Sequence, residues 1–123
     1  MANPSKAKGT KGETRVVNYL LSQGYKAQRR ALSGAEDKGD IEYSYGNHGQ
    51  VRILEVKTGK MTQNYSRSTR NEWLRQTEVE QHNAKMTAHL VVVRFGRAIE
   101  DAEVWSVDGQ TFMYLDEFAN HWK

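Results

Sequence analysis

Three charged residues lie at the ends of two adjacent apolar runs within residues 39–57, where they could together hold a metal ion. Asp40 opens the first run, and Glu55 and Lys57 close the second. The Gly-Asn-His-Gly segment at residues 46–49 favours a β-hairpin, because glycine and asparagine readily adopt the positive φ of a tight reversal. An antiparallel hairpin brings the start of its first strand beside the end of its second, and residues two apart share a strand face. The pattern therefore predicts a site for a hard divalent cation at one edge of a sheet.

A site of this kind suits the hydrolysis of a phosphodiester bond. That reaction needs carboxylates that hold one or two cations, a polarised water and a positive charge near the scissile phosphate. We expect Asp40 and Glu55 to bind the metal together with the main-chain carbonyl of Val56, and Lys57 to act on the water or the phosphate. The alternative is that Glu55 and Lys57 form only a surface ion pair, which contributes little to stability.

The composition limits which metal such a site can hold. The chain has no cysteine, so thiolate sites are excluded and the ligands must be oxygen or imidazole. This favours Mg²⁺, with Mn²⁺ able to replace it, over structural zinc.

The elements that must position these residues indicate an α/β fold, with a mixed central β-sheet of about five strands flanked by helices. Strands are predicted at residues 25–31, 39–43, 51–57, 89–95 and 103–107. The run 89–95 is the most apolar and is expected to be a central strand buried on both faces. Helices are predicted at residues 11–23, 69–85 and 115–122. The spacing of Thr69 and Glu72 predicts a capping box at the start of the second helix.

The first predicted helix carries a further carboxylate, Glu13. Four apolar residues of this helix recur at helical spacing: Val16, Val17, Leu20 and Leu21. Glu13 precedes them by about one turn, so it projects towards the domain from the same side as the apolar stripe. The simpler interpretation is that Glu13 stabilises the helix N-terminus through the macrodipole.

The chain of 123 residues is long enough for one compact domain. Residues 1–9 are polar and basic, and we expect them to form a flexible arm before a single domain at residues 10–123. No run reaches the length of a membrane span, and the N-terminus lacks the apolar segment of a signal peptide. We therefore expect a cytoplasmic protein, in the host cytoplasm if it is viral, with no membrane partner.

Positive charge is concentrated in the first part of the chain, while the net charge of the whole is +3. Residues 1–30 hold seven cations against a single acid: Lys6, Lys8, Lys11, Arg15, Lys26, Arg29 and Arg30. Lys60, Arg67 and Arg70 follow the hairpin. Basic residues beside carboxylates fit a polyanion that is positioned by its phosphates and cut at a metal. A solvated basic surface explains the charge equally well.

In this order and spacing, the motifs resemble those of the archaeal-type Holliday junction resolvases, which belong to the PD-(D/E)xK nuclease superfamily. The resemblance covers residues 8–95 and is carried by Lys8-Gly9, Glu13, Gly24-Tyr25, Arg29, Ser33-Gly34, Asp40-Ile41, Glu55-Val56-Lys57 and residues 91–95. Gly39 stands where the superfamily has a proline before the aspartate, and little aligns after Phe95. The resemblance implies a restriction-endonuclease-like fold.

The resemblance also implies a catalytic group made of Glu13, Asp40, Glu55 and Lys57. In this group Asp40 and Glu55 look like the metal ligands and Lys57 like the catalytic lysine. Glu13 matches a helix carboxylate of the family's site, which makes it a candidate for a further metal ligand.

The same resemblance places DNA contacts on three residues outside the catalytic group. Arg29 matches an arginine at the phosphate backbone, Ser33 a serine on a mobile loop, and Tyr65 an aromatic position after the lysine. Together with the basic residues, the predicted DNA-binding set is Lys8, Lys11, Arg29, Arg30, Ser33, Lys60, Tyr65 and Arg67.

The function that the resemblance implies is that of a Mg²⁺-dependent, structure-selective DNA endonuclease of recombination and repair. It would resolve four-way junctions by paired symmetric nicks, working as a homodimer. Trp105 and Trp122 belong either to the dimer interface or to the core. Two rival functions remain: a nuclease of the same superfamily that acts on flaps, ends or duplex DNA, and a non-catalytic DNA-binding module whose carboxylates are structural.

Overall fold

The computed structural model describes residues 4–30, 40–47 and 49–121, with side chains from Lys11 onward. In this part of the chain six strands form one sheet, and their order in the sheet follows their order in the sequence. They are β1 (Tyr25–Arg29), β2 (Ile41–Tyr45), β3 (Arg52–Lys57), β4 (Ala88–Val92), β5 (Glu103–Ser106) and β6 (Phe112–Tyr114). The β3–β4 pair is parallel and the other neighbouring pairs are antiparallel. The predicted α/β class with a mixed sheet is confirmed, with six strands rather than about five.

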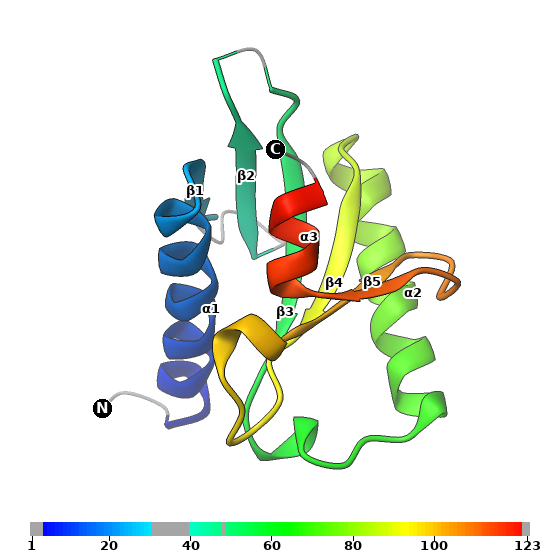
Figure 1. The fold of residues 1–123 in the computed structure, drawn as a ribbon. Helices are drawn as coiled ribbons and strands as arrows, with labels where there is room; N and C mark the ends of the chain where they lie inside the picture. Colours follow the sequence, from blue (N-terminus) through cyan, green and yellow to red (C-terminus); the bar gives the residue numbers. More distant parts are fainter. Residues whose placement is uncertain (1–3, 31–39, 48, 122–123) are drawn as a thin grey trace.

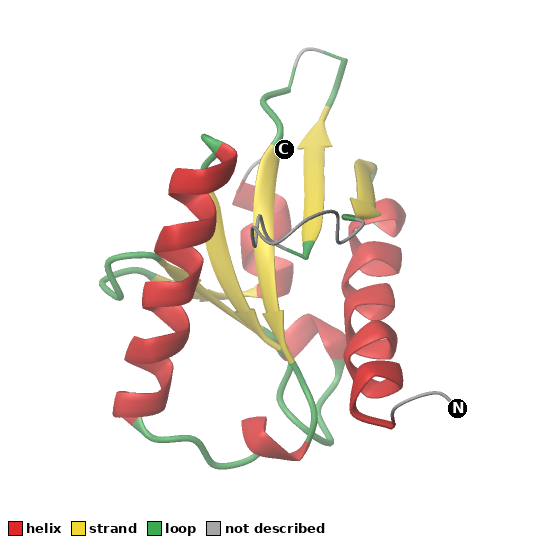
Figure 2. Ribbon diagram, turned by 180° about the vertical axis from the view of Figure 1, so that it is seen from behind, coloured by secondary structure: helices red, strands yellow, loops and turns green. Residues whose placement is uncertain are grey.

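Helices cover both faces of this sheet (Figure 1 and Figure 2). They are α1 (Pro4–Ser22), α2 (Arg67–Ala84) and α3 (Leu115–His121). On one face, Leu20 of α1 and Phe118 of α3 share a core with Leu54 of β3. On the other face, Trp73 of α2 packs with Leu90 of β4. None of the described helices is both long and apolar enough to cross a membrane.

The alternation of side chains along β3 decides which face carries the candidate site. Leu54 and Val56 point into the core beneath α1 and α3. Successive side chains of a strand point to opposite faces, so Glu55 and Lys57 point to the face covered by α2. The two charged residues that the sequence placed on one strand face therefore do share it.

The central position of β4 is confirmed. Leu90 and Val92 join the core beneath α2, whereas Val91 joins the core beneath α1 and α3. The strand is thus buried on both faces, as its β-branched run predicts, although it spans Ala88–Val92 rather than residues 89–95.

The predicted hairpin is present between β2 and β3. Ile41 pairs with Leu54 and Glu42 pairs with Ile53 in antiparallel register. Gly46 adopts a φ of 77° in the connecting turn, a conformation that glycine reaches without steric cost. The first strand of the hairpin spans Ile41–Tyr45, two residues beyond the predicted start at residue 39.

The prediction for the start of the first helix was wrong. The helix begins at Pro4 rather than Lys11, so residues 4–9, predicted as a flexible arm, are helical. Proline suits the first helical position because its missing N–H has no partner there anyway. As a result Glu13 lies in the interior of α1, so the alternative interpretation, that it stabilises the helix N-terminus, is wrong.

Two further corrections concern α2 and β6. The N-cap of α2 is Ser66, whose hydroxyl accepts the N–H of Thr69 at 3.1 Å, so the predicted cap at Thr69 was wrong. Three residues after the Asp108-Gly109 turn form β6, which was not predicted; it pairs antiparallel with β5 and leads directly into α3. Three residues are too few to show the alternation typical of a strand, so the sequence carries no detectable signal for β6.

His89 of β4 is a partly buried titratable residue beneath α3 that has no role in the predicted site. Its ring centroid lies 5.1 Å from that of Phe118. Burial, with a smaller contribution from the positive charge of Arg52, lowers the pKa of His89 to about 4. The folded protein therefore keeps this imidazole neutral across the physiological range.

Acidification should destabilise the protein through His89. The unfolded chain takes up this proton near pH 6.5 and the folded protein only near pH 4, so stability falls between those values. The loss in the free energy of unfolding should reach about 3 kcal/mol. Urea unfolding at pH 7 and at pH 4 measures it, and His89→Leu should flatten that part of the profile; an unchanged profile would contradict the assignment.

Gly12 should resist substitution although it lies within a helix. A Cβ at this position would lie 2.7 Å from the Thr58 side chain, closer than packed atoms approach. Gly12→Ala should therefore lower the free energy of unfolding by about 1–3 kcal/mol despite the better helix propensity of alanine. Asn18→Ala, at an exposed position of the same helix, is the control in urea unfolding and should be neutral or stabilising.

Candidate active site

Asp40 lies against β3 just before β2 begins. Its main-chain N–H donates to the Leu54 carbonyl at 3.0 Å, one residue out of step with the pairing of Ile41 and Leu54, which is the pattern of a β-bulge. The Oδ2 atom of Asp40 accepts the main-chain N–H of Val56 at 2.8 Å, so its carboxylate is held against β3.

Glu55 is a buried carboxylate with incomplete hydrogen bonding. The residue is 5% exposed, and its Oε1 atom lies 3.3 Å from the Lys57 ammonium. Its Oε2 atom is buried and has no hydrogen-bond partner among the described residues. Burying an unpaired carboxylate oxygen is costly, so this atom marks a position that a cation would satisfy.

Lys57 is held in place by contacts from two elements. Its ammonium donates to the Gln76 side-chain oxygen of α2 at 3.0 Å, besides its contact with Glu55. The side chain is 18% exposed, so it reaches solvent from a largely enclosed position. Gln76 was not predicted, because its role arises from the packing of α2 over β3 and leaves no local pattern in the sequence.

Glu13 approaches the same end of the sheet from the α1 side. Its Oε2 atom accepts a hydrogen bond from Arg29 Nε at 2.8 Å, and the side chains are 18% and 44% exposed respectively. Gly12 packs directly on Thr58, the residue after Lys57. The turn of α1 that carries Glu13 therefore lies against the end of β3.

The last residue of β1, Arg29, and the next residue, Arg30, make contacts on different faces of the sheet. Arg29 is paired in register with Ile41 and bonds to Glu13 of α1. Arg30 follows on the opposite face, where its Nη1 atom lies 3.7 Å from Glu42 and 3.9 Å from the Met86 sulfur. Both arginines thus flank the site, one on each side of the sheet.

The oxygen atoms at this site fit the ligands that a hard cation prefers. The N–H of Val56 points to Asp40, and the carbonyl of a strand residue points to the same side as its N–H, so the Val56 carbonyl is directed there too. Within the described residues no group of three His, Asp or Glu side chains is placed to hold a metal. The fit therefore rests on two carboxylates and one carbonyl, and a metal-binding role for Glu13 stays a prediction.

The other predicted DNA-binding residues differ in their exposure to solvent. Lys11, Lys60 and Arg67 are exposed. Tyr65 donates its hydroxyl to Glu103, its ring packs on Trp73, and burial together with Glu103 raises its pKa. The role of Tyr65 in binding DNA stays a prediction.

Two of the aromatic and basic positions are explained within the fold. The guanidinium of Arg70 lies 4.2 Å from the Trp105 ring centroid, and Trp105 is partly buried against the α2 side of the sheet. These contacts favour a place for Trp105 in the core over a place in a dimer interface. Ser33, Trp122 and the side chain of Lys8 lie outside the described residues.

Comparison with known proteins shows that the fold is similar to solved structures. The structure of Hjc, a Holliday junction resolvase from the archaeal hyperthermophile Archaeoglobus fulgidus, superposes with a TM-score of 0.57 at 21% sequence identity. The match covers 88% of this chain and 89% of that chain. No protein-family model matches the sequence, and no curated protein matches it. The likeness confirms the predicted restriction-endonuclease-like fold, with α-helices on both faces of a mixed sheet.

Magnesium should stabilise the protein through Glu55. A ligand that binds only the folded state at 100 times its dissociation constant adds about 2.7 kcal/mol to the free energy of unfolding, which raises the melting temperature by several degrees. Differential scanning calorimetry with and without Mg²⁺ measures this effect. Glu55→Gln should abolish the Mg²⁺ response without lowering the stability of the metal-free protein, because it removes a buried charge.

Glu78→Gln provides the matched control for this experiment. Glu78 is an exposed carboxylate of α2, and its substitution should leave the Mg²⁺ response unchanged. An equal response in the wild type and in Glu55→Gln would show that the metal binds elsewhere.

Proposed function

We propose that this protein is a metal-dependent DNA endonuclease that recognises branched DNA and resolves four-way junctions by paired symmetric nicks. The observation that carries the proposal is the buried, unpartnered Oε2 atom of Glu55, which lies on the same sheet face as Lys57 and next to Val56, whose N–H holds the Asp40 carboxylate. The likeness of the fold to that of a Holliday junction resolvase supports the choice of substrate.

In the proposed mechanism Asp40, Glu55 and the Val56 carbonyl hold Mg²⁺, which Mn²⁺ can replace. When bound, such a cation supplies an activated water and neutralises charge on the scissile phosphate. The ammonium of Lys57 is a donor only, and its contacts with Gln76 and Glu55 aim it along the same face. Lys57 would therefore bind a phosphate oxygen or orient the attacking water.

Arg29 and Glu13 would act on the DNA strand beside the cut. The guanidinium of Arg29 is partly exposed and has the planar donor geometry that matches a phosphate. Glu13 would position Arg29 through the hydrogen bond that joins them. In this proposal Glu13 belongs to the active site as a positioning residue rather than as a metal ligand.

The exposed cations would supply affinity without reading sequence. Lys11, Lys60 and Arg67 are accessible, and phosphate contacts of this kind make binding fall steeply as salt rises. Paired nicks on opposite strands require two active sites related by symmetry, so we propose that the protein acts as a homodimer. Its place of action would be the cytoplasm.

Asp40→Asn should abolish cleavage of a four-way junction. Loss of one ligand charge at the metal should reduce the rate of nicking at least about 100-fold, in the range seen when a group essential to transition-state stabilisation is removed. The assay incubates protein with end-labelled four-way junction, flap and linear duplex in Mg²⁺, and maps the nicks on a denaturing gel.

The exposed-site variant Glu78→Gln is again the control and should cut like the wild type. Symmetric nicks in the junction with little cutting of linear duplex are expected. Equal cutting of all three substrates would contradict junction selectivity, and full activity in Asp40→Asn would contradict the assigned metal site.

A further inference from the structure

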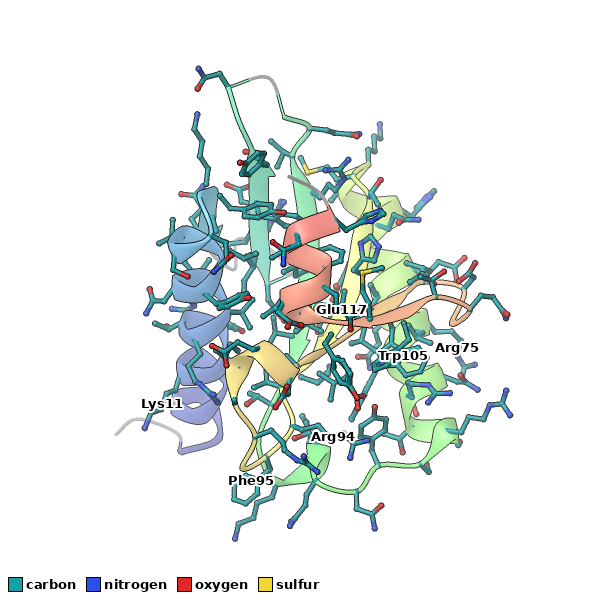
Figure 3. The ribbon with its side chains drawn as sticks, viewed as in Figure 1. Lys11, Arg75, Arg94, Phe95, Trp105 and Glu117 are labelled. Atoms are coloured by element: carbon teal, nitrogen blue, oxygen red, sulfur yellow. The ribbon has the colours of Figure 1, made fainter. Side chains whose placement is uncertain are left out.

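A basic groove with an exposed aromatic ring lies at the end of β3 and β4. It encloses about 280 Å³, and its charged lining consists of Lys11, Arg15, Lys60 and Arg94. No carboxylate is among the described residues that line it. Phe95 completes the lining, and Figure 3 shows Lys11, Arg94 and Phe95 at this end of the molecule.

The groove begins where the candidate active site ends. Thr58, which follows Lys57, belongs to its lining. The main-chain N–H of Val93 donates to the Lys57 carbonyl at 2.8 Å, which joins the segment after β4 to the last residue of β3. The groove, which α1 lines on one side, and the candidate site thus meet at the carboxyl end of β3.

Phe95 is exposed, and its backbone is fixed. The residue is 47% exposed and belongs to neither hydrophobic core. Its main-chain N–H donates to the Thr62 hydroxyl oxygen at 2.9 Å. Thr62 is fully buried, and its hydroxyl lies 2.7 Å from the Gly59 carbonyl and 3.0 Å from the Val93 carbonyl. This one side chain thus ties the loop after β3 to the loop after β4, and it holds Phe95 at the groove.

Two glycines that line the groove leave the backbone open to the close approach of a ligand. Gly59 and Gly96 adopt φ values of 93° and 78°. A Cβ built on either glycine would meet nothing within 4 Å. A ligand backbone could pass along both loops without displacing protein atoms.

The combination of cations with a fixed, exposed ring suits nucleic acid in which a base face is free. Lysine and arginine bind the phosphates, and an aromatic side chain stacks on a base whatever its sequence. In continuous duplex every base is stacked between neighbours and offers no free face. At a branch point the stack is interrupted.

From these contacts we infer that Phe95 stacks on a base exposed at the branch point and thereby selects branched DNA over continuous duplex. The inference rests on the proposed function and names the residue that gives it substrate selectivity. Arg94 also lines the groove, where its guanidinium forms an ion pair with Glu103 at 2.8 Å and lies 4.9 Å from the Tyr65 ring centroid, so it would add a phosphate contact in the groove.

The test compares binding of a four-way junction and of linear duplex by Phe95→Ala, Phe95→Trp and the wild type, in metal-free buffer so that no cutting is required. Loss of one base–aromatic stack should weaken junction binding about 10-fold and leave duplex binding unchanged. Phe95→Trp should restore junction binding. Phe112→Ala is the matched control, because Phe112 is 40% exposed on β6 at the far edge of the sheet.

A second measurement locates the contact directly. Junction DNA carrying 5-iodouracil at the branch point is irradiated with the wild-type protein, and the crosslinked peptide is identified by mass spectrometry. A crosslink on Phe95, absent when the same base lies within linear duplex, is the expected result.

The outcomes separate this inference from the proposed function. If the wild type cuts junctions in Mg²⁺ but Phe95→Ala keeps the wild-type ratio of junction to duplex binding, stacking by Phe95 is wrong and the nuclease proposal stands. If the wild type binds junctions selectively through Phe95 but never cuts them, the nuclease proposal fails and stacking stands. A wild type without selectivity for junctions overturns both.

Discussion

The candidate site depends on the register in which β2 meets β3. Two hydrogen bonds, from Asp40 N–H to the Leu54 carbonyl and from Val56 N–H to the Asp40 carboxylate, hold Asp40 against β3 just before β2 begins. A shift of one residue in the pairing would turn the side chains of β2 to the other face of the sheet and break both bonds. Such a shift would also carry Ile41, which is fully buried, out of the core. The hydrophobic core therefore fixes the geometry of the two carboxylates.

Glu55 shows how the site conflicts with the stability of the fold. Its carboxylate is buried, a second carboxylate, Asp40, is held by the next residue of β3, and one of the Glu55 oxygens lacks a hydrogen bond among the described residues. Lys57 offsets part of this cost, because its ammonium lies 3.3 Å from Glu55. An apolar side chain would fill the position at lower free energy. The proposed cation would lower this cost, because it would bind the unpaired oxygen and offset the negative charge of both carboxylates.

The sequence predicted the parts of the site whose signals are local. The hairpin followed from its glycine-rich turn, and the shared face of Glu55 and Lys57 followed from the strand period. The helical start at Pro4 was missed because Gly9 and Gly12 weaken helix propensity, and the reason for a glycine at position 12, the close approach of Thr58, appears only in the folded protein. Gln76 was missed for the same physical reason: contacts between distant elements depend on packing, which no short pattern encodes.

The parallel pairing of β3 with β4 explains why chemistry and proposed recognition share one edge of the sheet. Lys57 ends β3 directly beside Val92, the last residue of β4. Because the strands are parallel, their carboxyl ends lie on the same side, and the loops that follow leave the sheet together. Thr62 joins these loops, so Phe95 is held beside a groove that starts next to Lys57. In an antiparallel pair, the end of β4 and Phe95 after it would lie at the opposite end of the strands from Lys57. A base stacked on Phe95 would then lie far from the metal site.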